Sequence, residues 1–139
     1  MRTLPFLARL PLLLALLAGA CQRHRPEVLT ASPTSMKQLE GTWLLSAEEN
    51  SGDTLVYRPN TYAFPPVRGR TGFTLKEFGR FEQFEAVATG GLRGRDGTWT
   101  IAGNNRLHIH LADRQSPDYT LAILSFQKDE KVLRVRRQP

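Results

Sequence analysis

The segment TWTIAGNNRLHIHL, residues 98–111, decides the fold class of this chain. Its second half, RLHIHL, alternates polar and apolar residues, which is the period of a β-strand with one apolar face. The apolar face consists of Leu107, Ile109 and Leu111. Between the two halves, Gly103 or Asn104 can take the positive φ angle that a tight hairpin turn requires. The segment therefore predicts a β-hairpin with one face on a hydrophobic core.

Short runs of this kind recur after residue 40 between Gly, Pro, Asn and Asp, and helical periodicity is nearly absent. The expected strands cover residues 42–47, 54–57, 61–64, 72–76, 81–88, 97–102, 106–111, 119–126 and 131–136. Some of these runs form one bent strand, and consecutive hairpins favour an up-and-down order. We therefore expect an all-β fold, a small antiparallel up-and-down barrel of about eight short strands over residues 38–137.

The expected barrel has many large side chains for its interior. The nineteen candidates are Trp43, Leu45, Leu55, Tyr57, Phe64, Phe73, Leu75, Phe81, Phe84, Val87, Trp99, Ile101, Leu107, Ile109, Leu111, Leu121, Ile123, Leu133 and Val135. An eight-stranded barrel has an interior that side chains can just fill or that can hold one small ligand. We therefore expect a narrow pocket at most, near the open end.

Residues 1–20 have the composition of a secretory signal peptide. They contain Arg2 and Arg9 but no acid, the apolar run LPLLLALL at 10–17 and the small residues AGA at 18–20. That run is much shorter than the ~20 residues that a membrane-spanning helix needs. We therefore expect residues 1–20 to be removed rather than kept as a membrane anchor.

Cys21, the only cysteine, follows this segment directly, and LAGAC at residues 17–21 resembles the lipobox of bacterial lipoproteins. The resemblance implies that Cys21 becomes the lipid-modified first residue of the mature protein and attaches it to a membrane. The alternative is an ordinary signal peptide and a small buried thiol. Gln22 in place of Asp resembles lipoproteins sorted to the outer membrane. The lack of a following acidic run favours the periplasmic side over the cell surface.

The chain carries 19 basic and 13 acidic side chains, a net charge of +6. Removal of residues 1–20 takes away two arginines, which leaves 17 basic and 13 acidic side chains and a net charge of +4. Residues 21–37 lack hydrophobic periodicity, contain two prolines and read as a flexible tether. Its basic residues suit an anionic membrane surface. Since an exported protein meets little nucleic acid, we exclude nucleic-acid binding despite the basic charge.

The segment LEGTWLL, residues 39–45, places Gly41 and Trp43 at the start of the first expected strand. This resembles the Gly-x-Trp signature of lipocalins, and the whole domain is similar to the short lipocalin-like lipoproteins of bacteria. The resemblance implies that Trp43 plugs the closed end of an eight-stranded barrel. It also implies that an arginine near the chain's end, Arg134 or Arg136, packs on Trp43, an arrangement that cation–π attraction would favour. The domain is smaller than a classical lipocalin and has no helix after its last expected strand.

The tripeptide Arg-Gly-Arg occurs twice, in FPPVRGRTGF at residues 64–73 and in GLRGRDGTW at residues 91–99. The prolines and glycines around the first copy predict a loop. One interpretation is that these arginines are solvated side chains on barrel loops. The other is that they rim the open end and attract an anionic head group through forked hydrogen bonds. On the second interpretation the candidate ligand-binding residues are Arg68, Arg70, Arg93 and Arg95.

His108 and His110 lie on one face of a strand, a spacing that can ligate a metal ion. The sequence offers no third ligand, since the nearest acid is Asp113, so a solvent-facing polar strand is the better account. No Gly-x-Ser-x-Gly turn, catalytic triad spacing or paired carboxylates are recognisable. We therefore expect no enzyme activity, no metal and no other cofactor.

These patterns favour a lipid-anchored envelope lipoprotein that binds a small apolar or amphipathic molecule in a lipocalin-like barrel. We expect it to be a monomer. The alternative is a protein-interaction module of the cell envelope, such as an assembly accessory or a hydrolase inhibitor, with a filled, ligand-free barrel. The net charge of +4 argues against inhibition of a basic hydrolase such as lysozyme, since complementary charge normally aids such pairs.

Overall fold

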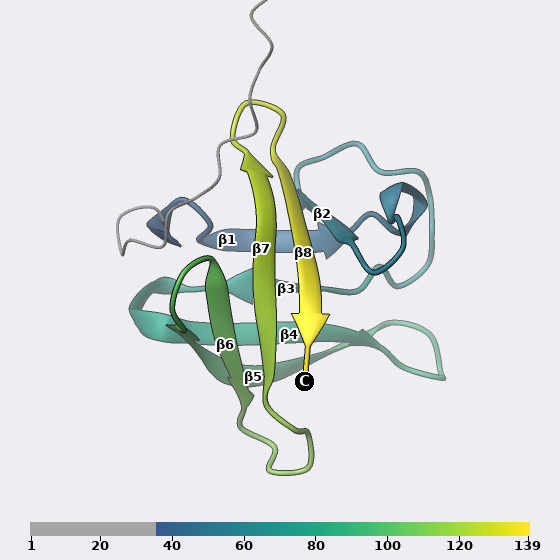
Figure 1. Ribbon diagram of the computed structural model, residues 1–139. Coiled ribbons are helices and arrows are strands. Elements are labelled where there is room, and N and C mark those ends of the chain that lie inside the picture. The colour runs from purple at the N-terminus through teal and green to yellow at the C-terminus, as the bar shows by residue number, and fades with distance from the viewer. Residues whose placement is uncertain (1–35) are drawn as a thin grey trace, which may run out of the picture.

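Eight antiparallel strands close into a barrel in the computed structural model, which describes residues 36–139 (Figure 1). The strands are β1 (Gly41–Leu45), β2 (Leu55–Pro59), β3 (Gly72–Leu75), β4 (Arg80–Ala86), β5 (Leu92–Ile101), β6 (Arg106–Leu111), β7 (Tyr119–Gln127) and β8 (Val132–Gln138). Two short 3₁₀ turns, η1 (Ala47–Glu49) and η2 (Glu77–Gly79), follow β1 and β3. The prediction of a small all-β barrel is confirmed.

Strand order around the barrel is β1-β2-β8-β7-β6-β5-β4-β3, so consecutive strands are neighbours from β3 to β8. At the start of the chain, β1 lies between β2 and β3. Residues 60–71 connect β2 to β3 and must therefore pass β1 from one end to the other. The strand expected at residues 61–64 belongs to this crossing loop, so that prediction is wrong. Two prolines directly after it remove the backbone donors that a ladder needs.

The hairpin of residues 98–111 forms as its sequence predicts. Trp99 pairs with Ile109 and Ile101 pairs with Leu107 across β5 and β6. In the turn, Gly103 has φ 72°, and the second residue with positive φ is Asn105, at 55°. The apolar face of β6 is completely buried, with side-chain exposures of 0–2%. The short alternating run of β6 therefore contributes three side chains to the hydrophobic core.

Fourteen of the nineteen expected interior residues belong to the core or pack against it. The five that do not are Leu45, Phe64, Phe84, Val87 and Ile101. Four core residues were not expected: Met36, Leu39, Tyr119 and Phe126. Phe126 points inward because the pairing of β7 with β8 shifts by one residue after Ile123, and a bulge exchanges the inward and outward faces of a strand.

Trp43 is buried, and the turn formed by residues 36–39 lies against it. Its indole Nε1 donates a hydrogen bond to the carbonyl of Leu39 at 2.7 Å, and its ring meets Phe126 edge to face at 5.9 Å. Met36 is also buried, so the folded part reaches at least two residues before the expected boundary at residue 38. Burial of each such side chain contributes about 1.5–3 kcal/mol.

The arginines expected on Trp43 are placed elsewhere. Arg134 donates to the amide oxygen of Gln127 at 3.0 Å, and Arg136 donates to Asp53 at 3.1 Å. They alternate along β8 with buried, inward-facing residues and so lie on the outer face of the barrel. The expectation of arginine packing on Trp43 is therefore corrected: the indole lies in the hydrophobic core, where it contacts Leu39 and Phe126.

Several expectations lie outside the described residues: the signal peptide at residues 1–20, the lipidated Cys21 and most of the tether. Over residues 36–139, no helix is long and apolar enough to cross a membrane.

Candidate functional site

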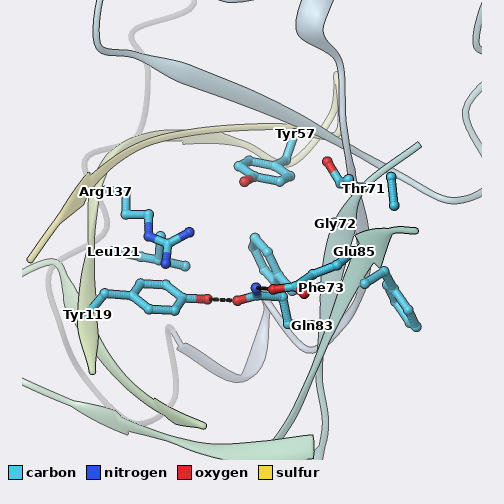
Figure 2. A pocket seen from close by; sticks show the side chains of 11 residues that line it. Tyr57, Thr71, Gly72, Phe73, Gln83, Glu85, Tyr119, Leu121 and Arg137 are labelled. Carbon is cyan, nitrogen blue, oxygen red and sulfur yellow. Dashed lines mark hydrogen bonds between the residues drawn. The ribbon is translucent and has the colours of Figure 1, made fainter. Parts of the chain in front are cut away.

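A cavity of about 410 Å³ opens at one end of the barrel, between β2, β3, β4, β7 and β8 (Figure 2). Its apolar lining includes Phe73 and Leu121, which are both nearly completely buried and form the floor. Polar side chains surround this floor: Tyr57, Thr71, Gln83, Glu85, Tyr119 and Arg137. The sequence predicted a narrow pocket at most, near the open end; the structure has this cavity there.

The cavity is polar because the inward-facing residues of two strands change character along their length. On β4 the inward series runs from the buried Phe81 to Gln83 and Glu85. On β8 it runs from the buried Val135 to Arg137. Because alternate residues of a strand share one face, the last inward positions place polar groups at the open end.

Arg137 and Tyr57 are hydrogen-bond donors that face the same space (Figure 2). The guanidinium of Arg137 lies over the ring of Tyr119, 3.8 Å from its centroid. Within residues 36–139 it has no acidic partner, and the Tyr57 hydroxyl has no hydrogen-bond partner. Burial raises the pKa of Tyr57 to about 12, so its hydroxyl keeps its proton at neutral pH.

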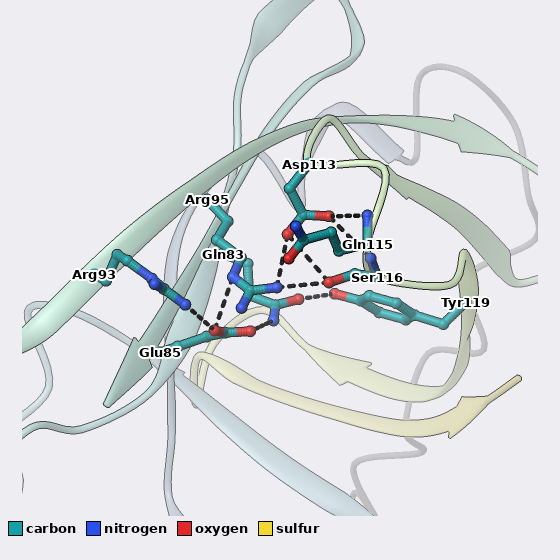
Figure 3. Close-up of polar contacts among 8 residues, drawn as sticks. All are labelled: Gln83, Glu85, Arg93, Arg95, Asp113, Gln115, Ser116 and Tyr119. Carbon is teal, nitrogen blue, oxygen red and sulfur yellow. Dashed lines mark hydrogen bonds and ion pairs between the residues drawn. The ribbon is translucent and has the colours of Figure 1, made fainter. Parts of the chain in front are cut away.

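Tyr119 is held in place by a chain of hydrogen bonds at the mouth (Figure 3). Its hydroxyl donates to the amide oxygen of Gln83 at 2.6 Å, and the amide nitrogen of Gln83 donates to Glu85 at 2.7 Å. Burial raises the pKa of Tyr119 as well. The ring that supports Arg137 is therefore held in place by the hydrogen bond from its own neutral hydroxyl to the Gln83 amide.

Glu85 is neutralised by the second Arg-Gly-Arg segment (Figure 3). Its carboxylate lies 2.9 Å from Nε of Arg95 and 3.6 Å from Nη2 of Arg93. Arg95 also lies 2.7 Å from Asp113, whose pKa is lowered mainly by the backbone N–H of Ser116. Both arginines are on β5, two residues apart, opposite the inward-facing Gln83 and Glu85. They therefore share the face that points to the mouth.

The first Arg-Gly-Arg segment has a different place. Arg70 forms a two-pronged ion pair with Glu48, at 3.0 and 3.1 Å, and donates to the carbonyls of Leu45 and Pro65. Its guanidinium also lies 4.3 Å from the ring centroid of Phe64. Arg68 is exposed on the same loop. None of the four candidate arginines lines the cavity itself, but Arg93 and Arg95 contact Glu85, which does. The four candidate arginines thus divide into one pair at the mouth and one pair on the crossing loop.

Arg58 holds the start of the crossing loop in the same way as Arg70 holds its end. Arg58 pairs with Glu49 through two hydrogen bonds of 2.6 and 2.8 Å, and lies 4.7 Å from the ring centroid of Tyr62. The hydrogen bonds from Arg58 lower the pKa of Glu49 to about 2. The loop is therefore fixed at both ends by an arginine that binds a glutamate and an aromatic ring.

His108 and His110 lie on the outer face of β6, away from the cavity. Both contact Asp118, at 3.1 and 2.7 Å, and the hydrogen bond from His110 lowers the pKa of that carboxyl. No group of three or more potential metal ligands is found in the part of the chain that the structure describes. The two histidines and Asp118 form a polar surface cluster.

The sequence interpretation missed Arg137, Tyr57 and Tyr119 as site residues. Arg137 directly follows Arg136 near the end of β8, and only the alternation with Leu133 and Val135 could have assigned it to the inward face. Nothing in the sequence shows that this face of β8 meets Tyr57 and Tyr119, because strand neighbours are set by the barrel.

Comparisons with protein-family models, with curated proteins and with solved structures find no match for this chain. The likeness to lipocalins rests on Gly41 and Trp43 and on the closed eight-stranded barrel. The function of the protein is therefore inferred from the chemistry of the cavity and from the first residues of the sequence.

Proposed function

We propose that this protein is a lipid-anchored envelope lipoprotein whose barrel binds a small amphipathic molecule in its open-end cavity. The observation that carries the proposal is the cavity of about 410 Å³, which combines an apolar floor with polar walls. Small-molecule sites typically have volumes of roughly 300–1,000 Å³ and a few placed polar groups. The alternative of a filled barrel acting only as a protein-interaction module has less support, because this space is open.

The ligand carries an anionic group, such as a carboxylate or a phosphate. Arg137 and Tyr57 offer donors that have no acceptor within the described residues. A purely apolar ligand would cover these donors without a hydrogen bond, which is costly. An anion between them would form charge-assisted hydrogen bonds. The apolar part of the ligand would then contact Phe73 and Leu121.

The location follows from the lipobox-like LAGAC and Gln22: Cys21 carries the lipid, and the protein is held at the outer membrane on its periplasmic side. One acyl chain gives only marginal membrane binding, so several chains on Cys21 would make the attachment stable. The proposed role is binding, and no catalytic step is assigned.

The test is mass spectrometry of small molecules that copurify with the protein from its own envelope. We compare wild type with Arg137→Met and with the matched control Arg136→Met, whose side chain lies on the outer face near Asp53. A discrete anionic amphiphile should accompany wild type and the Arg136 variant and be lost from the Arg137 variant. An empty barrel in all three proteins would contradict ligand binding and favour a protein partner, which crosslinking in cells would detect.

A further inference from the structure

Phe78, in the turn between β3 and β4, is 94% exposed although it is a large apolar residue. It also has a left-handed backbone conformation, with φ 59° and ψ 30°, and is followed by Gly79 at φ 72°. Such turns favour Asn-Gly at these two positions, and an aromatic residue there is strained. The domain gains no burial from Phe78 in return. A strained, exposed aromatic residue points to a role outside the folded domain.

Phe78 belongs to an apolar surface patch, which it forms with Trp99 and Ile101. The three residues line a surface hollow of about 450 Å³. Ile101 is 37% exposed, and the half-buried Trp99 is fixed by its Nε1, which donates to the carbonyl of Lys76 at 3.1 Å. Contiguous exposed apolar surface on a small domain marks a site of interaction.

The described chain begins beside this patch, because Lys37 and Glu40 line the same hollow. Cys21 lies fifteen residues before Met36, so the chain between them spans at most about 50–55 Å. The cavity lies at the other end of the barrel, since β4 runs from the Phe78 turn to Gln83 and Glu85. A lipid on Cys21 would therefore tether the barrel from the end that carries the patch, and the patch could reach the bilayer surface.

We propose that the patch of Phe78, Trp99 and Ile101 docks on the membrane interface and holds the barrel with its cavity facing away from the bilayer. The proposal rests on the lipid anchor of the proposed function. Aromatic side chains are favoured at the boundary between head groups and acyl chains. The patch supplies a second contact beside the lipid, and it fixes the orientation that a tether alone leaves open. Ligand would then enter from the aqueous side.

The test uses the chain's single cysteine. When Cys21 is lipidated its sulfur is blocked, so Phe78→Cys offers one free thiol for an environment-sensitive fluorophore such as NBD. The matched control is Thr89→Cys, exposed in the hairpin between β4 and β5 at the cavity end. The lipidated proteins are reconstituted into phosphatidylethanolamine–phosphatidylglycerol vesicles that contain brominated lipid.

The fluorophore at position 78 should shift to the blue and be quenched several-fold more strongly than the fluorophore at position 89. Equal quenching at the two positions would overturn the docking proposal, as would shielding of position 78 in native envelopes but not in vesicles, which would indicate a protein partner. Two further measurements test the lipid anchor separately: a lipidated protein floats with the vesicles, and it is labelled at one thiol because Cys21 is blocked. Proteins that do not float and that label at Cys21 as well would refute the anchor, and docking with it.

Discussion

The two Arg-Gly-Arg segments have the same sequence and different uses. At residues 93–95 the tripeptide lies in the extended strand β5, so both arginines point to one face and meet Glu85 at the mouth of the cavity. At residues 68–70 it lies in a loop, where Arg70 folds back onto Glu48 and Arg68 stays exposed. The difference shows that backbone conformation, and not the motif, decides what a short basic segment contacts.

The largest expected effect is the loss of stability when the contacts of Arg70, which hold the end of the crossing loop, are removed. Arg70→Ala removes the ion pair with Glu48 and two hydrogen bonds to carbonyls from a guanidinium side chain that is only 10% exposed. We expect the free energy of unfolding to fall by about 2–3 kcal/mol, whereas Arg68→Ala should change it by less than about 0.5 kcal/mol. Chemical denaturation of both variants measures the difference. Equal effects would mean that Arg70 does not hold the loop.

Acid should weaken the ion pair between Arg58 and Glu49 that holds the start of the crossing loop. Glu49 has a pKa of about 2 in the folded protein and an ordinary value of 4.5, so its pairing with Arg58 stabilises the fold fully above about pH 4.5. That contribution is lost as the pH falls toward 2. Glu49→Gln should be less stable at neutral pH and should lose less stability between pH 4.5 and 2, as measured by denaturation across this range. An unchanged slope would contradict the role of this carboxylate.

Arg93 and Arg95, at the mouth of the cavity, should affect ligand binding more than the stability of the fold. The double variant Arg93→Met/Arg95→Met leaves Glu85 and Asp113 without these partners and turns the mouth negative. We expect the affinity for an anionic probe, decanoate, to fall roughly tenfold, with decanol little affected, as calorimetric titration can measure. Arg68→Met is the control on the other copy of the tripeptide. If Arg68→Met weakened decanoate binding as much, the assignment of Arg93 and Arg95 to the mouth and of Arg68 to the crossing loop would not explain binding.

The smallest expected effect is a difference in stability between variants of Gly69 and Gly94, the central glycines of the two Arg-Gly-Arg segments. Gly69 has φ +62°, so Gly69→Ala should cost about 1 kcal/mol of stability. A Cβ on Gly94 would meet only the end of the flexible Glu82 side chain, at 2.6 Å, and that side chain can move aside. Gly94→Ala should therefore cost less than about 0.5 kcal/mol. Thermal denaturation that ranked the two variants in the opposite order would contradict the loop and strand assignments.

Much of the fold could be predicted because period-two alternation is a local property of a strand. It assigned Leu107, Ile109 and Leu111 to the core and most strands to their places. It failed where local signals competed with pairing. The strand expected at residues 97–102 begins five residues earlier, at Leu92, because β4 pairs with it along residues 80–86.

The sequence alone determined that this is an all-β chain of hairpins, with apolar residues that recur at the period of a strand and a lipobox-like segment at its start. Only the tertiary structure decided that β1 lies between β2 and β3, that Arg70 clamps a loop and that Arg137 faces Tyr57 and Tyr119. The physical reason is that alternation fixes which residues of one strand share a face. Which strands become neighbours is fixed by closure of the barrel, through contacts between residues far apart in the chain.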